Sequence, residues 1–154
     1  MRLLKEYVQF ILKGEDNMSY DHEKPPGGGI VVVRQFDDGW RVLCLHTEDF
    51  MDLPKGGIDP GEDVLSTALR ETQEEANITD LRFSWGFKTV KLNQLTMFLA
   101  ETKQDPEITP NPHTGVLEHL GASWLGWNEA YSATKPWLAP SIEWARKIIE
   151  KQAA

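Results

Sequence analysis

Cysteine is almost absent from this sequence. The single thiol, Cys44, excludes a disulfide within the chain and a zinc site built from cysteines. Cys44 lies in the apolar run VLCLH, where we expect a small buried strand residue. A chain without disulfides fits a reducing compartment, and we expect a cytoplasmic protein.

Long hydrophobic runs are also missing. The apolar stretches are only a few residues long, far below the ~18 residues that a membrane-spanning helix needs. Residues 1–13, MRLLKEYVQFILK, do not resemble a signal peptide, because charged residues interrupt the apolar ones and no small-residue cleavage site follows. We therefore expect neither a membrane span nor a membrane partner.

Positive charge is scarce. Lysine and arginine number 16 against 24 aspartates and glutamates, and the formal net charge is -8. Such a chain repels a polyanion, so we do not expect a general nucleic-acid surface, and we expect no binding to DNA. A site loaded with divalent cations could still bind phosphates, because the charge of the ions dominates locally.

The remaining composition is that of one globular domain. The chain has 154 residues, of which 40% are hydrophobic. Apolar residues recur at helical spacing near the N-terminus and predict an amphipathic helix that docks on the domain or forms a dimer contact. We divide the chain into this helix with its linker, residues 1–24, and a domain over residues 25–154. Both a monomer and a homodimer remain open.

Apolar patterning and turn residues predict a mixed sheet between helices, an α/β fold. Strands are expected in GGGIVVVRQF and RVLCLH, joined by an Asp-Gly turn, and in residues 81–90, 94–101 and GASWLGW. Helices are expected over residues 62–76 with Leu69 on the apolar side, after Asn128 as a cap, and over 140–152 with Ser141 as N-cap or in the first turn. Residues 49–61 and 103–115 are predicted loops, and the second is a candidate rim or lid.

The segment LPKGGIDPGEDVLSTALRETQEEANI, residues 53–78, joins a glycine-rich turn to an acidic helix. Helical residues three and four apart share a face, so Glu71, Glu74 and Glu75 point to roughly one side. Hard divalent cations prefer oxygen ligands, and Mg²⁺ binds through one or two carboxylates plus substrate phosphates. For the three glutamates alone, a solvated acidic face is the alternative.

The full spacing of this segment narrows that choice. Between its first glycine and its last isoleucine it resembles the Nudix box of the Nudix hydrolase family, with matches at Gly56, Glu62, Arg70, Glu71, Glu74, Glu75 and Ile78. Two positions depart from the commonest box. Thr72 stands where a larger aliphatic residue is usual, and Asn77 where glycine is usual, although asparagine tolerates the left-handed conformation.

The resemblance implies a Nudix-type αβα sandwich, a divalent metal (Mg²⁺ or Mn²⁺), and hydrolysis of a diphosphate linked to another moiety, often a nucleoside. It implies that Glu71, Glu74 and Glu75 ligate the metals through carboxylates and Gly56 through its carbonyl. Arg70 and Glu62 are implied as orienting partners. Glu71 and Glu75 are the expected catalytic carboxylates of the box, assisted by Arg70.

Motifs outside the box are similar to those of the asymmetrical diadenosine tetraphosphate hydrolases within this family. The pattern EH..A.WLGWNEA begins at Glu118. In that group this glutamate lies near the metals, so the resemblance implies Glu118 as a further metal ligand and catalytic carboxylate; an ordinary loop acid is the alternative. Lys55 and Lys88 resemble phosphate contacts, although Lys88 alone could be a surface lysine. The motif PKGG also resembles the PQGG of bacterial RNA 5′-pyrophosphohydrolases.

Base stacking requires an exposed aromatic ring, and Tyr131 and Trp137 are the candidates, with a packing role as the alternative for each. The four histidines show no metal-ligand spacing, and His113 in the predicted lid is expected to be a surface residue. Three functions are open. They are hydrolysis of diadenosine tetraphosphate to ATP and AMP, hydrolysis of an RNA 5′ end or another nucleoside diphosphate derivative, and an inactive binding module.

Overall fold

A computed structural model describes residues 26–153 of the chain. The predicted N-terminal helix and its linker, residues 1–24, lie outside these described residues. Among the described helices, none combines the length and the apolar character that a membrane span requires.

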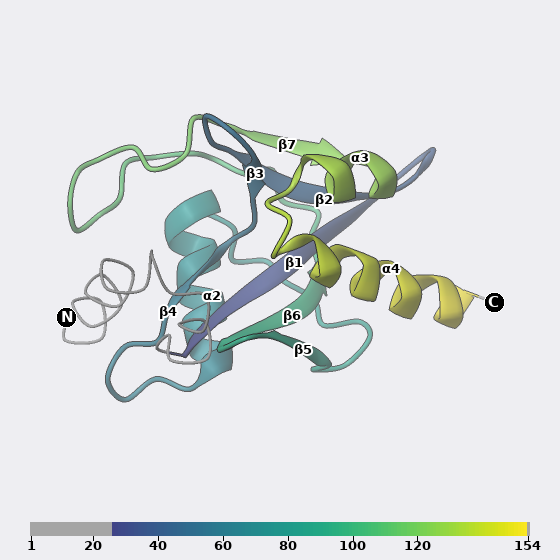
Figure 1. Cartoon of the computed structure of the whole chain (residues 1–154), viewed down its shortest axis with the longest axis horizontal. Coiled ribbons are helices and arrows are strands. Elements are labelled where there is room, and N and C mark those ends of the chain that lie inside the picture. Colours follow the sequence, from purple (N-terminus) through teal and green to yellow (C-terminus); the bar gives the residue numbers. More distant parts are fainter. Residues whose placement is uncertain (1–25, 154) are drawn as a thin grey trace.

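A seven-stranded mixed sheet forms the centre of the molecule (Figure 1). Its main path runs β3-β2-β1-β6-β5, while β4 pairs with β1 and β7 pairs with β2. β1 and β6 run parallel, and the other paired strands run antiparallel. The strands are β1 (Gly27–Phe36), β2 (Gly39–His46), β3 (Met51–Asp52), β4 (Lys55–Gly57), β5 (Thr89–Leu92), β6 (Leu95–Glu101) and β7 (Ala122–Leu125).

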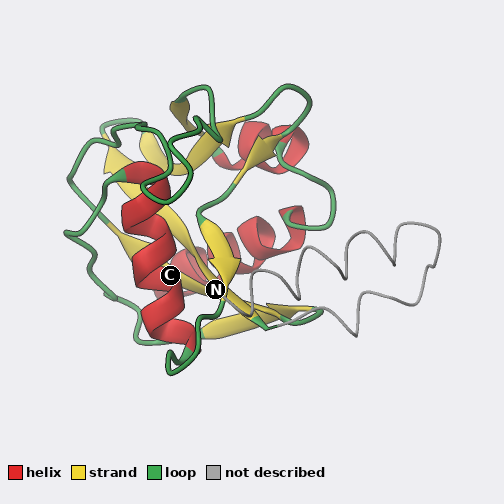
Figure 2. Ribbon diagram, turned by 90° about the vertical axis from the view of Figure 1, so that its left-hand side faces the viewer, coloured by secondary structure: helices red, strands yellow, loops and turns green. Residues whose placement is uncertain are grey.

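Helices cover both faces of this sheet, as Figure 2 shows. The helix α2 (Val64–Ala76) packs on one face, and α3 (Trp127–Ala133) and α4 (Ala139–Ala153) pack on the other. The predicted αβα sandwich is therefore confirmed.

The two cores explain why residues 30–33 of β1 are apolar without interruption. Val31 and Val33 belong to the core under α4, whereas Ile30 and Val32 belong to the core under α2. Because successive strand residues point to opposite faces, a strand covered on both faces needs apolar residues at every position. Cys44 of β2 is fully buried in the α4 core, as predicted, and burial raises the pKa of its thiol to about 12.

The limits of α2 follow from its caps. The side chain of Asp63 accepts a hydrogen bond from the Ser66 amide, so the helix begins at Val64, two residues after the expected start. At the other end Asn77 adopts the left-handed conformation, with φ of 55°. The predicted apolar side was wrong at Leu69, which is 38% exposed. Thr72 is buried instead, and its hydroxyl donates to the Ala68 carbonyl.

Three further expectations differ from the structure. The strand expected over residues 81–90 is reduced to Thr89–Leu92 and an isolated bridge at Arg82. Asn128 does not cap α3, because Gly126 holds that position and the Asn128 amide oxygen instead accepts from Arg146. The loop expected over residues 49–61 contains the short strands β3 and β4. Ser141 lies in the first turn of α4, as predicted.

Candidate metal and phosphate site

A cavity of about 400 Å³ opens where β4, α2 and the loop before β7 meet. The predicted metal ligands all line this cavity: the carboxylates of Glu71, Glu74, Glu75 and Glu118, and the backbone of Gly56. Arg70 lines it as well. The cavity is also lined by the turn between β5 and β6, through Leu92, Asn93, Gln94 and Leu95. The structure thus brings the residues of the box and the distant Glu118 to one place.

The three glutamates of α2 are held close to the β4 backbone. Their side chains are only 11 to 17% exposed. The Lys55 amide donates to Glu75 Oε1 at 2.8 Å. A Cβ atom at Gly56 would lie 2.1 Å from the Glu71 carboxylate, so only glycine leaves room for this side chain. The glycine of the turn and the glutamate of the helix are therefore one structural unit.

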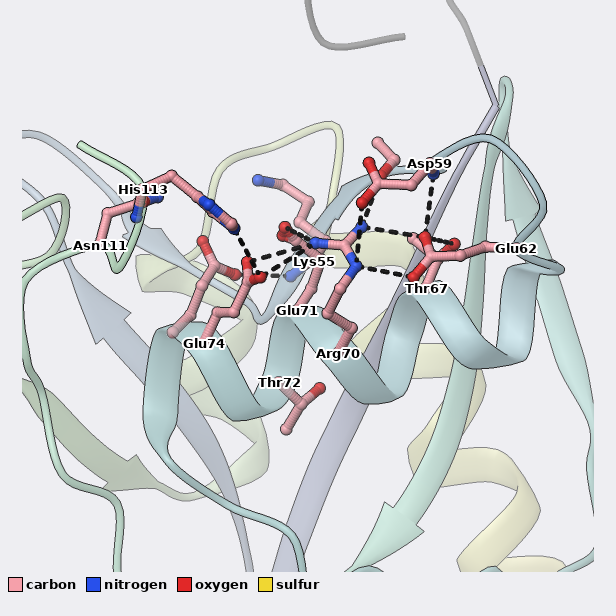
Figure 3. Close-up of polar contacts among 12 residues, drawn as sticks. Lys55, Asp59, Glu62, Thr67, Arg70, Glu71, Thr72, Glu74, Asn111 and His113 are labelled. Carbon is pink, nitrogen blue, oxygen red and sulfur yellow. Dashed lines mark hydrogen bonds and ion pairs between the residues drawn. The ribbon is translucent and has the colours of Figure 1, made fainter. Parts of the chain in front are cut away.

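Arg70 joins the turn to the helix (Figure 3). Its guanidinium donates to Glu62 Oε2 at 2.7 Å and to the Gly57 carbonyl at 3.0 Å. It also lies 3.4 Å from Glu71 and 3.2 Å from Glu74. Hydrogen bonds from Arg70 lower the pKa of Glu62 to about 2, so this carboxylate is a permanent anchor. Through these contacts Arg70 and Glu62 could orient the other glutamates, and this role stays a prediction.

Two carboxyl groups of α2 are unfavourable as anions in the protein alone. Burial and the neighbouring charges of Glu74 and Glu118 raise the pKa of Glu71 to about 7, although Arg70 partly offsets this. Burial, together with Glu71 and Asp52, raises the pKa of Glu75 well above its usual value. Both groups offer only oxygen, which suits hard divalent cations. The donor set therefore fits Mg²⁺ or Mn²⁺, because a bound cation would stabilise the charged carboxylates.

The long loop before β7 is fastened to the C-terminal end of α2. The Asn77 amide donates to the Glu107 carbonyl at 2.7 Å and to Thr109 Oγ1 at 3.0 Å. A glycine at this position could not make these contacts. Beyond the anchor, Asn111 donates to Glu118 at 3.2 Å, and His113 Nε2 lies 3.5 Å from Glu74. The loop therefore carries Glu118 to the cavity. His113 is exposed, as expected, although it lines the cavity.

His119 and Asp52 lie beside the glutamates of the cavity, and the sequence reasoning did not single them out. His119 is 6% exposed, and its Nε2 lies 3.1 Å from Asp52 Oδ2. Its Nδ1 lies 3.9 Å from Glu75 Oε2. Spacing along the sequence could not show these contacts, because Asp52 and Glu75 come from segments far from His119 in the chain. The available signal was its position directly after Glu118.

The predicted substrate residues separate into two groups. Lys55 and Trp137 line the cavity, and the Lys55 ammonium lies 5.8 Å from the centre of the Trp137 ring. Lys88 and Tyr131 are exposed and do not belong to its lining among the described residues. Substrate contacts by Lys88 and Tyr131 stay predictions.

Comparisons with known proteins show which family this sequence resembles. The model of the NUDIX domain matches residues 23–149. A rat (Rattus norvegicus) asymmetrical bis(5′-nucleosyl)-tetraphosphatase is 41% identical over 87 residues, which cover 50% of this chain and 56% of the relative. A Caenorhabditis elegans protein of the same name is 69% identical over 54 residues, covering 33% and 39%. The chain thus spans about half the length, or less, of these curated relatives.

The fold has a solved counterpart as well. The structure of a C. elegans Ap4A hydrolase binary complex superposes with a TM-score of 0.60 at 24% identity, covering 84% of this chain and 96% of that one. At this identity the likeness concerns the fold alone. The family match extends over most of the chain and includes the glycine turn, the acidic helix and Arg70. The chain therefore belongs to the Nudix family.

Proposed function

We propose that this protein is a divalent-metal-dependent hydrolase of nucleoside polyphosphates, with diadenosine tetraphosphate as its substrate. The observation that carries the proposal is the cavity in which Glu71, Glu74 and Glu75 meet Glu118 and the Gly56 turn. These carboxylates are the proposed ligands of Mg²⁺ or Mn²⁺, together with the Gly56 carbonyl. Their crowding in a partly buried place supports the proposal, because carboxylates left without a cation there raise one another's pKa.

Bound divalent cations would neutralise the phosphate oxygens, lower the pKa of a bound water and stabilise the leaving oxygen. The residues of the chain supply the remaining parts. Arg70 orients Glu71 and Glu74 through its guanidinium. Glu71 or Glu75 takes the proton as the water oxygen bonds to phosphorus. One phosphoanhydride bond breaks in this step, and the leaving phosphate departs with the electrons of that bond.

Lys55 is the proposed contact for a phosphate beyond the metals. Its ammonium has three donors, and an ion pair with Asp52 at 3.0 Å fixes its direction at the cavity wall. Trp137 beside it offers a ring on which an adenine could stack. A site with both features suits a substrate that has several phosphates and a base at its end.

The choice of diadenosine tetraphosphate is supported by the names of the two relatives, both asymmetrical tetraphosphatases. The matched segments cover only part of each relative, 56% and 39% of their lengths. An RNA 5′ end is the second candidate, because residues 54–57 form the motif PKGG, which resembles the PQGG of bacterial RNA 5′-pyrophosphohydrolases.

A substrate panel with Mg²⁺ tests the proposal. It contains diadenosine tetraphosphate, triphosphorylated RNA, ADP-ribose and nucleoside triphosphates, with products separated by chromatography. We expect ATP and AMP from the tetraphosphate, with kcat/KM about tenfold or more above ADP-ribose, which corresponds to about 1.4 kcal/mol. A chelator should abolish turnover. Full activity in excess EDTA would contradict the metal site, and a preference for RNA would select the second candidate.

A further inference from the structure

The two ring nitrogens of His119 have different neighbours. One forms a hydrogen bond with Asp52, and the other faces Glu75. Nε2 lies 3.1 Å from Asp52 Oδ2, whereas Nδ1 makes no hydrogen bond with another of the described residues. The imidazole is nine-tenths buried and keeps this orientation between β3 and α2. A ring nitrogen that faces a carboxylate and has no hydrogen-bond partner among the described residues is available to a ligand.

Asp52 determines which nitrogen carries the proton. Its carboxylate also contacts Lys55 Nζ at 3.0 Å and Lys135 Nζ at 3.3 Å, so it is an ionised acceptor. An ionised carboxylate cannot donate, and His119 must therefore donate from Nε2. In the neutral ring Nδ1 then presents a lone pair toward Glu75. Metal-ligating histidines commonly donate their other N–H to a carboxylate in this manner.

The distances around Nδ1 suit a shared cation. One donor atom from each of Glu75, Glu118 and His119 lies within 4.8 Å of the others. The separation of 3.9 Å between Nδ1 and Glu75 Oε2 is too long for a hydrogen bond. It is compatible with two ligands that each lie about 2.1–2.2 Å from the same ion.

We propose that His119 Nδ1 is a nitrogen ligand of the divalent cation beside Glu75 and Glu118, with Asp52 as the residue that positions the ring. This inference rests on the metal dependence proposed above and adds a ligand that the acidic helix does not contain. Imidazole favours transition metals over Mg²⁺, so the protein should bind Mn²⁺ more tightly than Mg²⁺. Asp52 is a positioning residue, because it acts through the ring.

Pulsed electron paramagnetic resonance on the full chain loaded with Mn²⁺, without substrate, tests this directly. We expect ¹⁴N modulation from a directly bound imidazole, which ¹⁵N-histidine labelling shifts. His119→Ala and the larger His119→Gln should remove the modulation and weaken Mn²⁺ binding by about tenfold or more. Both variants should also lower the ratio of Mn²⁺ affinity to Mg²⁺ affinity. Asp52→Asn should keep the modulation and weaken Mn²⁺ binding by about tenfold.

His113→Ala is the matched control, because His113 is the other histidine at the cavity and should leave the nitrogen signal in place. Bound Mn²⁺ without nitrogen modulation, or modulation lost with His113, would overturn the inference and leave the proposed hydrolase standing. Failure to bind Mn²⁺ at all would contradict the proposed function as well. Thermal unfolding of each variant separates a lost ligand from a lost fold.

Discussion

Asp52 and Glu75 are two nearly buried carboxylates on opposite sides of His119, with side-chain exposures of 6% and 11%. Burial would raise the pKa of Asp52, but the hydrogen bond from His119 and the charges of Lys55 and Lys135 outweigh it and hold this pKa below its usual range. Burial also raises the pKa of Glu75, where Lys55 offsets only part of the effect.

The difference between them shows that burial alone does not identify a metal ligand. Cations belonging to the chain surround Asp52, so its negative charge is already compensated. Glu75 has Glu71 and Asp52 as neighbours and only Lys55 to offset them, so a cation from outside the chain would stabilise its charge. Four experiments can break or sharpen this distinction.

The largest expected effect is on catalysis. Glu75→Gln should keep the fold and reduce kcat/KM by about 10³ or more, because charge stabilisation and water activation fail together. Glu129→Gln makes the same change on the exposed side of α3 and should leave the rate unaltered. If Glu75→Gln kept over half the activity with the tetraphosphate, the assignment of the site to α2 would be wrong.

The second largest effect is expected from filling the space that Gly56 leaves for the Glu71 side chain. Gly56→Ala would place a methyl group 2.1 Å from the carboxylate, which must then leave its position. We expect a loss of about 10² in kcat/KM and weaker Mg²⁺ binding, measured by calorimetry. At Gly57 a Cβ would meet nothing within 4 Å, so Gly57→Ala should lose far less. Equal losses of kcat/KM for both variants would mean that the turn needs the backbone flexibility of glycine, and not the room that Gly56 leaves for Glu71.

In the metal-free protein, removing the charge of Asp52 and removing that of Glu75 should change the free energy of unfolding in different directions. Asp52→Asn leaves two lysines near a neutral group and should lower the free energy of unfolding by about 3 kcal/mol. Glu75→Gln removes an uncompensated buried charge and should leave the metal-free protein unchanged or more stable by about 1 kcal/mol. Urea unfolding in EDTA measures both. Destabilisation by Glu75→Gln as large as that by Asp52→Asn would remove the distinction.

The smallest effect is a pH dependence of the metal-free protein. The pKa of Glu71 rises from 4.5 to about 7 on folding, so the folded state binds more protons between these values. Its stability should therefore fall as the pH rises from 5 to 8, by on the order of 5 °C in Tm. The lowered pKa of Asp52 acts in the opposite sense, and only below about pH 4.

Scanning calorimetry in EDTA from pH 5 to 8 checks this slope. Glu71→Gln should reduce the slope, and the raised pKa of Glu75 should account for the slope that remains. Added Mg²⁺ should raise Tm more at pH 8 than at pH 5. A Tm that rises with pH over this range in the metal-free protein would show that Glu71 is not protonated in the fold.

The acidic helix was predictable because its information is local. The spacing of Glu71, Glu74 and Glu75 fixes their common face whatever the surrounding fold. The cap at Asn77 was equally local. The strand predicted over residues 81–90 was wrong for residues 81–88, because aromatic residues alternate there as they would in a strand. The rings pack instead on each other and on Trp40, with Phe83 and Phe87 4.7 Å apart, and Gly86 has a φ of 85°.

The Asp52–His119 pair was not predictable, because it depends on tertiary contact. The two residues are 67 positions apart, and the strand that carries Asp52 has only two residues. Glu118 was found through its resemblance to a family motif and not through any periodicity. The sheet register brings β7 beside β2, which places the start of that motif near the cavity. Spacing identifies ligands on one helix, whereas ligands on loops require the fold.

The burial of Cys44 has a practical consequence. It is the only cysteine in the chain, its side chain is fully enclosed, and its pKa of about 12 leaves almost no thiolate near neutral pH. A thiol reagent can therefore reach it only when the sheet opens. The rate of labelling by such a reagent would report the opening of the core in the natural sequence, and its slowing by Mg²⁺ would measure how much a bound ion stabilises the fold as a whole.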